Sequence, residues 1–213
     1  MSHPKTRAAA RALVLGLGLL VAACAASAPT RYYTLTSIEP SREAAPQRRP
    51  LVIGVGPMAV ADYLDRPQIV TRSTAMELQL HDFDMWVETL EAIFSRTLSE
   101  DLSALLGTDS VVLMPAPREV QLDYQVEVDV LRFDAMRPGD VMLDAMWRLY
   151  GRDGIELMRD GRARITAVVA EPEAEDGALP PPSYDLSPVV AAMSDATLQL
   201  ARQIATAIAT ARN

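Results

Sequence analysis

A stretch of strict alternation between apolar and polar side chains, residues 119–135 (EVQLDYQVEVDVLRFDA), places the tightest limit on how this chain can fold. Successive side chains of a β-strand point to opposite faces, so this pattern predicts one long strand with a buried and a solvated face. The apolar face comprises Val120, Leu122, Tyr124, Val126, Val128 and Val130. The phase then reverses, because Leu131 and Phe133 occupy the polar side, and we expect a β-bulge near residues 130–131.

Shorter strands are predicted on both sides of this segment. A nearly continuous apolar run at 51–60 favours a strand buried on both faces. The turn sequences Arg137-Pro138-Gly139-Asp140 and Arg152-Asp153-Gly154 predict an antiparallel meander. Further short strands are expected at 31–37, 68–73, 76–80, 110–115, 141–151 and 162–170. The polar, proline-containing stretches 39–50 and 171–183 are expected to be loops.

Two helices are predicted to complete the fold. Residues 86–107 carry apolar side chains at helical spacing, and we expect Asp84 to cap the start of this helix and Gly107 to end it. Residues 184–213 predict a long final helix. Its apolar stripe consists of Val189, Met193, Ala196, Leu200, Ile204 and Ile208. The expected fold is therefore α/β, with a mixed, largely antiparallel sheet packed against two main helices.

The first 23 residues have the features of a secretory signal peptide. Lys5, Arg7 and Arg11 precede the apolar run 12–23 (ALVLGLGLLVAA), which ends in small residues. A transmembrane helix needs about 20 apolar residues, so this run is too short to span a bilayer. We therefore expect residues 1–23 to be removed on export.

The one cysteine of the chain, Cys24, directly follows this leader. Val21-Ala22-Ala23-Cys24 resembles the lipobox of bacterial lipoproteins, in which the chain is cut before the cysteine and the thiol is alkylated with diacylglycerol. Several acyl chains together make membrane attachment effectively permanent. The resemblance predicts cleavage between Ala23 and Cys24, a lipid on Cys24, a short linker over 24–30 and a single α/β lipoprotein domain over 31–213. The alternative is a chance cysteine at the end of the leader.

The charge of the chain argues against polyanionic partners. The full chain has 20 basic and 28 acidic residues, and three of the basic residues lie in the leader, which leaves a mature net charge of −11. Nucleic acids and anionic lipid headgroups are bound through Lys and Arg. We therefore expect no nucleic-acid partner, and we interpret the acidic residues as a solvated surface that keeps the domain soluble.

The mature chain has no residue constellation that points to catalysis, a metal or a cofactor. His81 is its one histidine, and the neighbouring Asp82 and Asp84 come without an evident nucleophile, so a catalytic triad is not expected. One imidazole with nearby carboxylates is also a weak and nonspecific metal site. The glycine-containing stretch 54–57 lacks the third glycine and the following helix of a phosphate-binding loop. We therefore expect a protein that is not an enzyme.

Four motifs follow the lipobox in a fixed order. They are Tyr32-Tyr33-x-Leu35, IGVGPMAVADYLDRPQIVTR at 53–72, Trp86-x-Glu88-x-Leu90 and YQVEV at 124–128. Together they resemble the ABC-type transport auxiliary lipoproteins of the paraquat-inducible protein C family, and YLDRPQIV is the most specific part. Thr89 departs from the family pattern, in which proline often follows the glutamate.

This resemblance implies a three-layer α/β fold and a place in an MCE-type ABC lipid transport system, where MCE-domain proteins form a tunnel across the periplasm. It implies a non-catalytic outer-membrane lipoprotein that anchors or docks this tunnel, so that phospholipid passes between the membranes. Ala25 and Ala26 after the lipidated cysteine favour the outer membrane, on its periplasmic face. The alternatives are activation of a periplasmic cell-wall enzyme and direct lipid carriage between sheet and helices, and homo-oligomerisation stays open.

The loop that carries the most specific motif is the candidate partner-binding surface. Tyr63, Leu64, Arg66 and Pro67 bring apolar and cationic groups together between two strands, and Arg and Tyr are frequent contact anchors. We expect the double substitution Arg66→Ala, Leu64→Ala to weaken capture of an MCE-domain tunnel protein with little change in melting temperature. In the alternative, Tyr63 and Leu64 close the edge of the core and Arg66 pairs with Asp65 or a helix end.

Overall fold

The computed structural model describes residues 29–39, 51–117, 119–136, 139–152, 154–170 and 185–212. The chain divides into a short N-terminal unit, Met1–Thr30, and a compact unit, Arg31–Asn213. The leader, the cleavage site at Ala23 and Cys24, and most of the linker and of the two proline-containing loops lie outside the described residues. None of the helices in the described ranges is long and apolar enough to cross a membrane.

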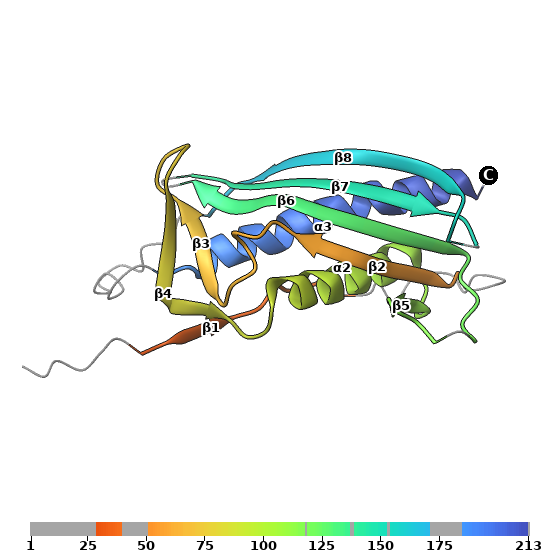
Figure 1. The fold of residues 1–213 in the computed structure, drawn as a ribbon, viewed down its shortest axis with the longest axis horizontal. Coiled ribbons are helices and arrows are strands. Elements are labelled where there is room, and N and C mark those ends of the chain that lie inside the picture. Colours follow the sequence, from red (N-terminus) through yellow and green to blue (C-terminus); the bar gives the residue numbers. More distant parts are fainter. Residues whose placement is uncertain are drawn as a thin grey trace, which may run out of the picture. The chain divides into compact units, whose positions relative to one another are not determined.

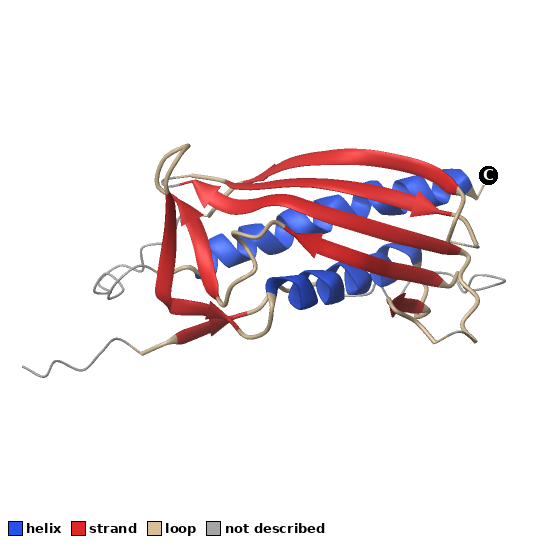
Figure 2. Ribbon diagram, in the orientation of Figure 1, coloured by secondary structure: helices blue, strands red, loops and turns tan. Residues whose placement is uncertain are grey.

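Eight strands of the larger unit form one curled, mixed sheet (Figures 1 and 2). They are β1 (Arg31–Tyr33), β2 (Ile53–Val60), β3 (Gln68–Arg72), β4 (Leu78–Trp86), β5 (Val111–Leu113), β6 (Tyr124–Met136), β7 (Val141–Tyr150) and β8 (Leu157–Ala167). The order is β1-β4-β3-β6-β2-β5, and β7 and β8 extend the sheet from β6. The β1–β4, β2–β5, β2–β6 and β3–β6 pairs are parallel, whereas the long β6–β7 and β7–β8 ladders are antiparallel. The predicted mixed sheet with an antiparallel meander is therefore confirmed.

The long alternating segment forms β6, although this strand begins at Tyr124 rather than at residue 119. The predicted bulge is confirmed, because the register between β6 and β7 shifts between Val130 and Arg132. Leu131 is exposed at this point, and Phe133 returns to the core. The extra residue at the bulge therefore lets the apolar side chains before and after it point to the same, buried face of the sheet.

Residues before β6 pack against the sheet instead of extending it. A Cβ atom added at Gly54 of β2 would lie 2.8 Å from Leu122 Cδ1, so the glycine makes room for the leucine. A side chain at this second residue of β2 would displace Leu122, which explains why the strand has a glycine here. The short strand predicted at 76–80 is longer in the structure, where β4 begins at Leu78 and continues to Trp86.

Two helices, α2 (Leu90–Leu106) and α3 (Ser187–Ala211), pack on the same face of the sheet and against each other. The predicted stripe of α3 is buried throughout: Val189, Met193, Ala196, Leu200, Ile204 and Ile208. Phe94 of α2 meets Phe133 of β6 edge to face, with ring centroids 5.4 Å apart. This contact is part of the hydrophobic core that the two helices and the sheet share.

The α/β class, with a mixed sheet packed against two main helices, is confirmed. The outward-facing residues of β7, such as Asp144 and Arg148, alternate with buried ones, and they pair with charged residues of neighbouring strands. Within the described ranges this face carries no helix. A sheet face rich in charged pairs can remain in water.

The first helix starts later than the sequence predicts. Trp86 still belongs to β4, where it pairs with Tyr33 of β1, and Asp84 lies within the strand. Thr89 is the N-cap, and its Oγ1 accepts a hydrogen bond from the N–H of Ala92 at 3.3 Å. Asp84 as the cap is therefore wrong. The predicted end is confirmed, since Gly107 adopts a left-handed conformation with φ of 62°.

Replacing Thr89 with alanine is expected to cost about 1 kcal/mol of unfolding free energy, because an N-cap oxygen satisfies an otherwise free helical N–H. Urea denaturation followed by circular dichroism measures this cost. Thr89→Ser keeps the hydroxyl and serves as the control. Equal stability of the alanine and serine variants would show that the cap contributes nothing.

Candidate functional site

The loop between β2 and β3, residues 61–67, is held at both ends by the sheet. The N–H of Ala61 donates to the carbonyl of Val130 in β6 at 2.9 Å, and the N–H of Trp86 in β4 donates to the carbonyl of Pro67 at 2.7 Å. Inside the loop, the N–H of Leu64 donates to the carbonyl of Ala61 at 2.8 Å. The candidate partner-binding residues therefore lie on an ordered turn between two strands.

Two of these four residues do not face solvent. Leu64 is 3% exposed and belongs to the hydrophobic core, and Tyr63 packs against that core. The expectation that Leu64 is an exposed contact residue is therefore wrong. Because truncating a buried leucine leaves a cavity, the double substitution with Arg66→Ala would lower the melting temperature instead of leaving it nearly unchanged.

Tyr63 belongs to an ionic cluster around Asp134 of β6, whose side chain is completely buried. The Tyr63 hydroxyl donates to Asp134 Oδ2 at 2.8 Å. Arg72 donates from Nε to Oδ1 at 3.2 Å and from Nη2 to Oδ2 at 3.0 Å, and Arg132 donates from Nε to Oδ1 at 2.9 Å. The guanidinium carbon of Arg72 also lies 6.0 Å from the centroid of the Tyr63 ring. Both carboxylate oxygens are thus fully used.

The pKa values in this cluster follow from these contacts. Burial alone would raise the pKa of Asp134, but the hydrogen bonds from Arg72, Tyr63 and Arg132 outweigh burial and hold it below its usual range. Burial and the hydrogen bond to Asp134 raise the pKa of Tyr63 to about 12. Tyr63 is therefore a neutral donor that ties the loop to β6, which gives it a positioning role.

The other two candidate residues, Arg66 and Pro67, line an open pocket of about 300 Å³. This Arg66 pocket is formed by Asp65, Arg66, Pro67, Trp86, Val87, Glu88 and Thr89. The loop supplies one wall, and the end of β4 with the N-cap of α2 supplies the other. The pocket therefore joins two of the sequence motifs, YLDRPQIV and Trp86-x-Glu88-x-Leu90, which lie about 20 residues apart in the chain.

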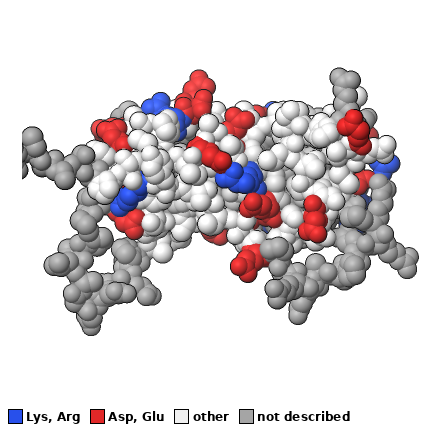
Figure 3. Space-filling view, turned by 90° about the horizontal axis from the view of Figure 1, so that it is seen from below, with Lys and Arg blue, Asp and Glu red and all other residues white. Residues whose placement is uncertain are grey.

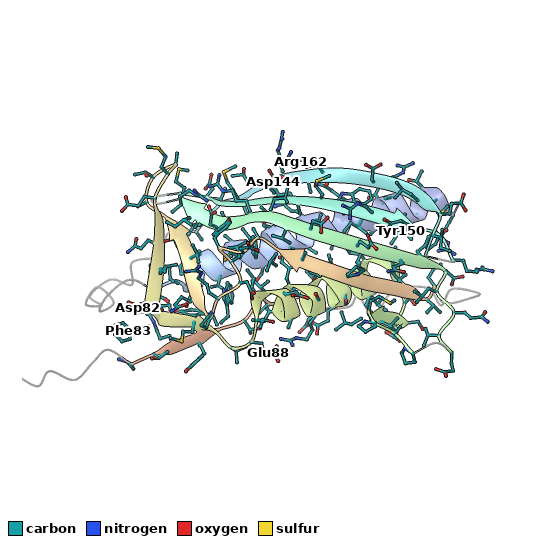
Figure 4. The ribbon with its side chains drawn as sticks, in the orientation of Figure 1. Asp82, Phe83, Glu88, Asp144, Tyr150 and Arg162 are labelled. Carbon is teal, nitrogen blue, oxygen red and sulfur yellow. The ribbon has the colours of Figure 1, made fainter. Side chains whose placement is uncertain are left out.

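Arg66 brings an unused donor to this pocket. Its Nε is buried and has no hydrogen-bond partner among the residues that the structure describes. Glu88 on the other wall is engaged by Arg96, with 2.6 Å between Oε2 and Nη1 (Figure 4). Because Nε is buried, an oxygen from outside would have to approach the exposed part of the Arg66 side chain, beside the apolar surface of Pro67 and Val87.

The remaining candidates from the sequence make contacts inside the fold. His81 Nε2 lies 2.9 Å from Thr71 Oγ1. Asp84 accepts from Arg31 Nε at 2.8 Å and from the Tyr33 hydroxyl at 3.0 Å. In the described part of the chain, no three His, Cys, Asp or Glu side chains are grouped so as to hold a metal ion.

Sequence reasoning missed the second wall of the pocket and the cluster around Asp134. Trp86 and its neighbours were assigned to a helix, so their approach to Pro67 could not be anticipated. The motif Trp86-x-Glu88-x-Leu90 was the one available signal. The sequence around Asp134 contained no such signal. The contacts of Asp134 depend on the parallel pairing of β3 with β6, in which Arg72 lies opposite Met136.

Acidic and basic side chains are interspersed on the face of the molecule shown in Figure 3. Charged side chains on the outer side of β6 and β7 are paired as well, as in the contacts of Arg148 with Glu127 and Asp129 at 3.4 and 2.8 Å. A nucleic-acid surface is instead a continuous basic patch. This face therefore matches the solvated surface expected from the net charge.

Comparisons with known proteins agree with this architecture. A crystal structure described as an uncharacterized protein has a TM-score of 0.60 at 19% identity and covers 85% of this chain and 99% of that chain. Protein XCC0632 from Xanthomonas campestris, assigned to the DUF330 family, has a TM-score of 0.62 at 18% identity, with 83% and 93% covered. At these identities the likeness shows the fold alone.

No curated protein matches the chain. The sequence profile of one family, described as ABC-type transport auxiliary lipoprotein component, matches residues 33–205. This range extends from the end of β1 into the last turns of α3, and it includes both walls of the Arg66 pocket. The chain therefore belongs to the family of ABC-type transport auxiliary lipoprotein components.

Proposed function

We propose that this chain is a non-catalytic, lipid-anchored component of an MCE-type ABC lipid transport system, and that it docks a periplasm-spanning tunnel at the outer membrane. Membership of the auxiliary lipoprotein family over residues 33–205 carries the proposal. Cys24 supplies the anchor, after cleavage behind Ala23. The Arg66 pocket supplies the contact, because it places Arg66 beside the apolar side chains of Pro67 and Val87 on an ordered part of the surface.

The geometry supports docking close to the membrane. Arg31 is the seventh residue after Cys24, and an extended chain of this length spans at most about 25 Å. β1 therefore stays near the bilayer. The N–H of Val87, which lines the Arg66 pocket, donates to the carbonyl of Tyr33 in β1 at 3.0 Å. A tunnel that ends at the membrane would meet the pocket at this side of the domain.

Purification of the native lipoprotein from detergent-solubilised envelopes tests this function directly. We expect an MCE-domain protein to co-purify, and we expect mass spectrometry to show a mature chain that begins at an acylated Cys24. Capture of a cell-wall synthase in place of the MCE-domain protein would favour the enzyme-activator alternative. An unacylated N-terminus would refute the anchor.

Replacing Arg66 with alanine is expected to weaken capture of the tunnel protein about tenfold, because a desolvated arginine at a contact contributes more than 1 kcal/mol. Unfolding free energy should change by less than about 1 kcal/mol, since the Nε has no partner inside the fold. The matched control is Arg164→Ala, which removes the same charge from an exposed position on β8. Equal capture by both variants in a titrated pull-down would remove the Arg66 pocket from the interface.

A further inference from the structure

The β1–β4 pair presents a second surface, which we call the tether-side face. It consists of Tyr32, Leu78, Leu80, Phe83, Met85 and Val87. It borders the Arg66 pocket at Val87, and Leu78 lies opposite Arg72 of the ionic cluster. Figure 4 shows Phe83 at the outer edge of β4, near β1. Its residue Tyr32 lies on β1, the strand that directly follows the linker from Cys24.

Strand pairing places these side chains on one face. Leu78, Leu80 and Met85 lie opposite Arg72, Val70 and Gln68, which are alternate residues of β3. The register shifts between these pairs, so the side-chain phase of β4 changes from even-numbered to odd-numbered residues.

The same face continues onto β1 and past the end of β4. Tyr32 lies beside Met85 in the parallel β1–β4 ladder, and Phe83 and Val87 are two residues before and after Met85. The opposite face of the pair carries Asp84 and Trp86, which are buried. One side of the pair is therefore built into the core, and the other side is apolar and open.

The tether-side face is unusually exposed for its composition. Tyr32 is 65%, Phe83 is 47% and Val87 is 56% exposed. Among the described residues, Tyr32 and Phe83 are the exposed aromatic side chains. Contiguous apolar residues on a surface mark a contact with a protein or a membrane, whereas single ones need no explanation.

We propose that the tether-side face rests in the headgroup region of the bilayer that holds the lipid anchor. This inference rests on the anchor at Cys24 in the proposed function. The seven-residue connection keeps β1 within about 25 Å of the bilayer surface, and Tyr32 is the second residue of that strand. Aromatic side chains favour the membrane interface, where one part of the ring meets hydrocarbon and another meets water.

The charged residues beside the tether-side face indicate which lipid headgroups it can contact. Asp82 lies beside the face and is exposed, whereas Glu88 is paired with Arg96 at 2.6 Å and Arg31 with Asp84 at 2.8 Å. Anionic headgroups would be repelled by the Asp82 carboxylate. The contact is therefore apolar, with zwitterionic headgroups, and it should not weaken when salt is added, since salt screens charge but not apolar burial.

Tryptophan fluorescence of the full lipidated chain in phosphatidylcholine vesicles tests this placement. Phe83→Trp and Tyr32→Trp each add an indole to the face, and the parent chain, whose Trp86 and Trp147 are buried, gives the baseline. Met146→Trp on the outer side of β7, 39% exposed, is the matched control. Each variant is measured in ordinary vesicles and in vesicles with acyl chains brominated near the headgroup.

The added indoles at positions 83 and 32 should lose roughly half or more of their emission in brominated vesicles, since an interfacial indole lies within reach of the bromines. The control at 146 should lose none, and raised salt should leave the loss unchanged. Two variants on different strands cover the case in which one of them misfolds.

Equal emission in brominated and ordinary vesicles for vesicle-bound Phe83→Trp and Tyr32→Trp would overturn the proposal. A blue shift without quenching would also overturn it, because the face would then be covered by protein, such as a second copy of the chain. A failure of the anchor gives a different result. Every variant, including the control, would then stay in the bottom fraction of a flotation gradient, because none of them would be bound to vesicles.

Discussion

Asp134→Ala is expected to lower the free energy of unfolding by about 3–5 kcal/mol, because it leaves two arginines facing each other without their carboxylate in a poorly solvated site. Arg72, Arg132 and Tyr63 all donate to Asp134, which is completely buried. Urea denaturation at neutral pH measures the loss. Loss of the cluster should also loosen the 61–67 loop, because Tyr63 ties this loop to Asp134. Capture of the tunnel protein through Arg66 should therefore weaken as well.

The matched control for this prediction is Asp144→Ala on β7. Asp144 also accepts two hydrogen bonds from an arginine, Arg162, at 2.7 and 2.6 Å, but this pair lies on the exposed face of the sheet (Figure 4). Solvated pairs contribute at most about 1 kcal/mol. A loss at Asp134 no larger than the loss at Asp144 would contradict the structural role of the buried cluster.

The pH dependence of the Asp134 contribution has a defined sign. The pKa of Asp134 is lowered in the folded state, so the cluster stabilises the fold at pH values above the ordinary aspartate pKa of 3.8. This contribution is lost as the pH falls through the lowered folded value. Asp134→Ala should therefore differ most from the parent chain at neutral pH and least in strong acid.

The free energy of unfolding of the Asp101→Asn variant is expected to rise relative to that of the parent chain as the pH increases. The difference between the two should grow by about 2 kcal/mol between pH 4.5 and pH 7.5. Asp101 is completely buried in α2, and burial raises its pKa to about 6, although it accepts a hydrogen bond from the N–H of Ile38 at 2.9 Å. Glu100 adds to the rise and Arg202 opposes it. Because the folded pKa lies above the unfolded one, the parent chain loses stability as the pH rises from about 4 to 6.

Urea denaturation of both chains across this pH range gives the difference. Asparagine keeps an acceptor for Ile38 and cannot ionise, so its curve should lack the decline of the parent chain. Glu91→Gln, at an exposed position of the same helix, should run parallel to the parent. A constant difference between the asparagine variant and the parent would show that Asp101 titrates normally in the fold.

Local pattern was enough to predict some elements. The alternation before and after Val130 predicted both β6 and its bulge, because side-chain direction in a strand depends on neighbours in the chain alone. The spacing of the α3 stripe predicted a long helix for the same reason. The start of α2 was mispredicted, since Trp86 fits a helical pattern as well as a strand and its pairing with β1 decided the outcome.

The candidate site was predicted in part. Arg66 and Pro67 do line a pocket, whereas Leu64 joins the core and Tyr63 binds Asp134. A short apolar sequence in a loop does not show whether it faces water, because the answer depends on what the rest of the chain places beside it.

The sequence by itself determined the α/β class, the long strand with its bulge, the final helix and a core without disulfides, because periodicity, turn residues and cysteine content are local or additive properties. Tertiary structure alone decided which polar residues are buried, where the Arg66 pocket has its second wall and why six apolar side chains of the β1–β4 pair share one open face. These features depend on the pairing of β3 with β4 and β6, and a register shift in one ladder changes the face on which every later side chain lies.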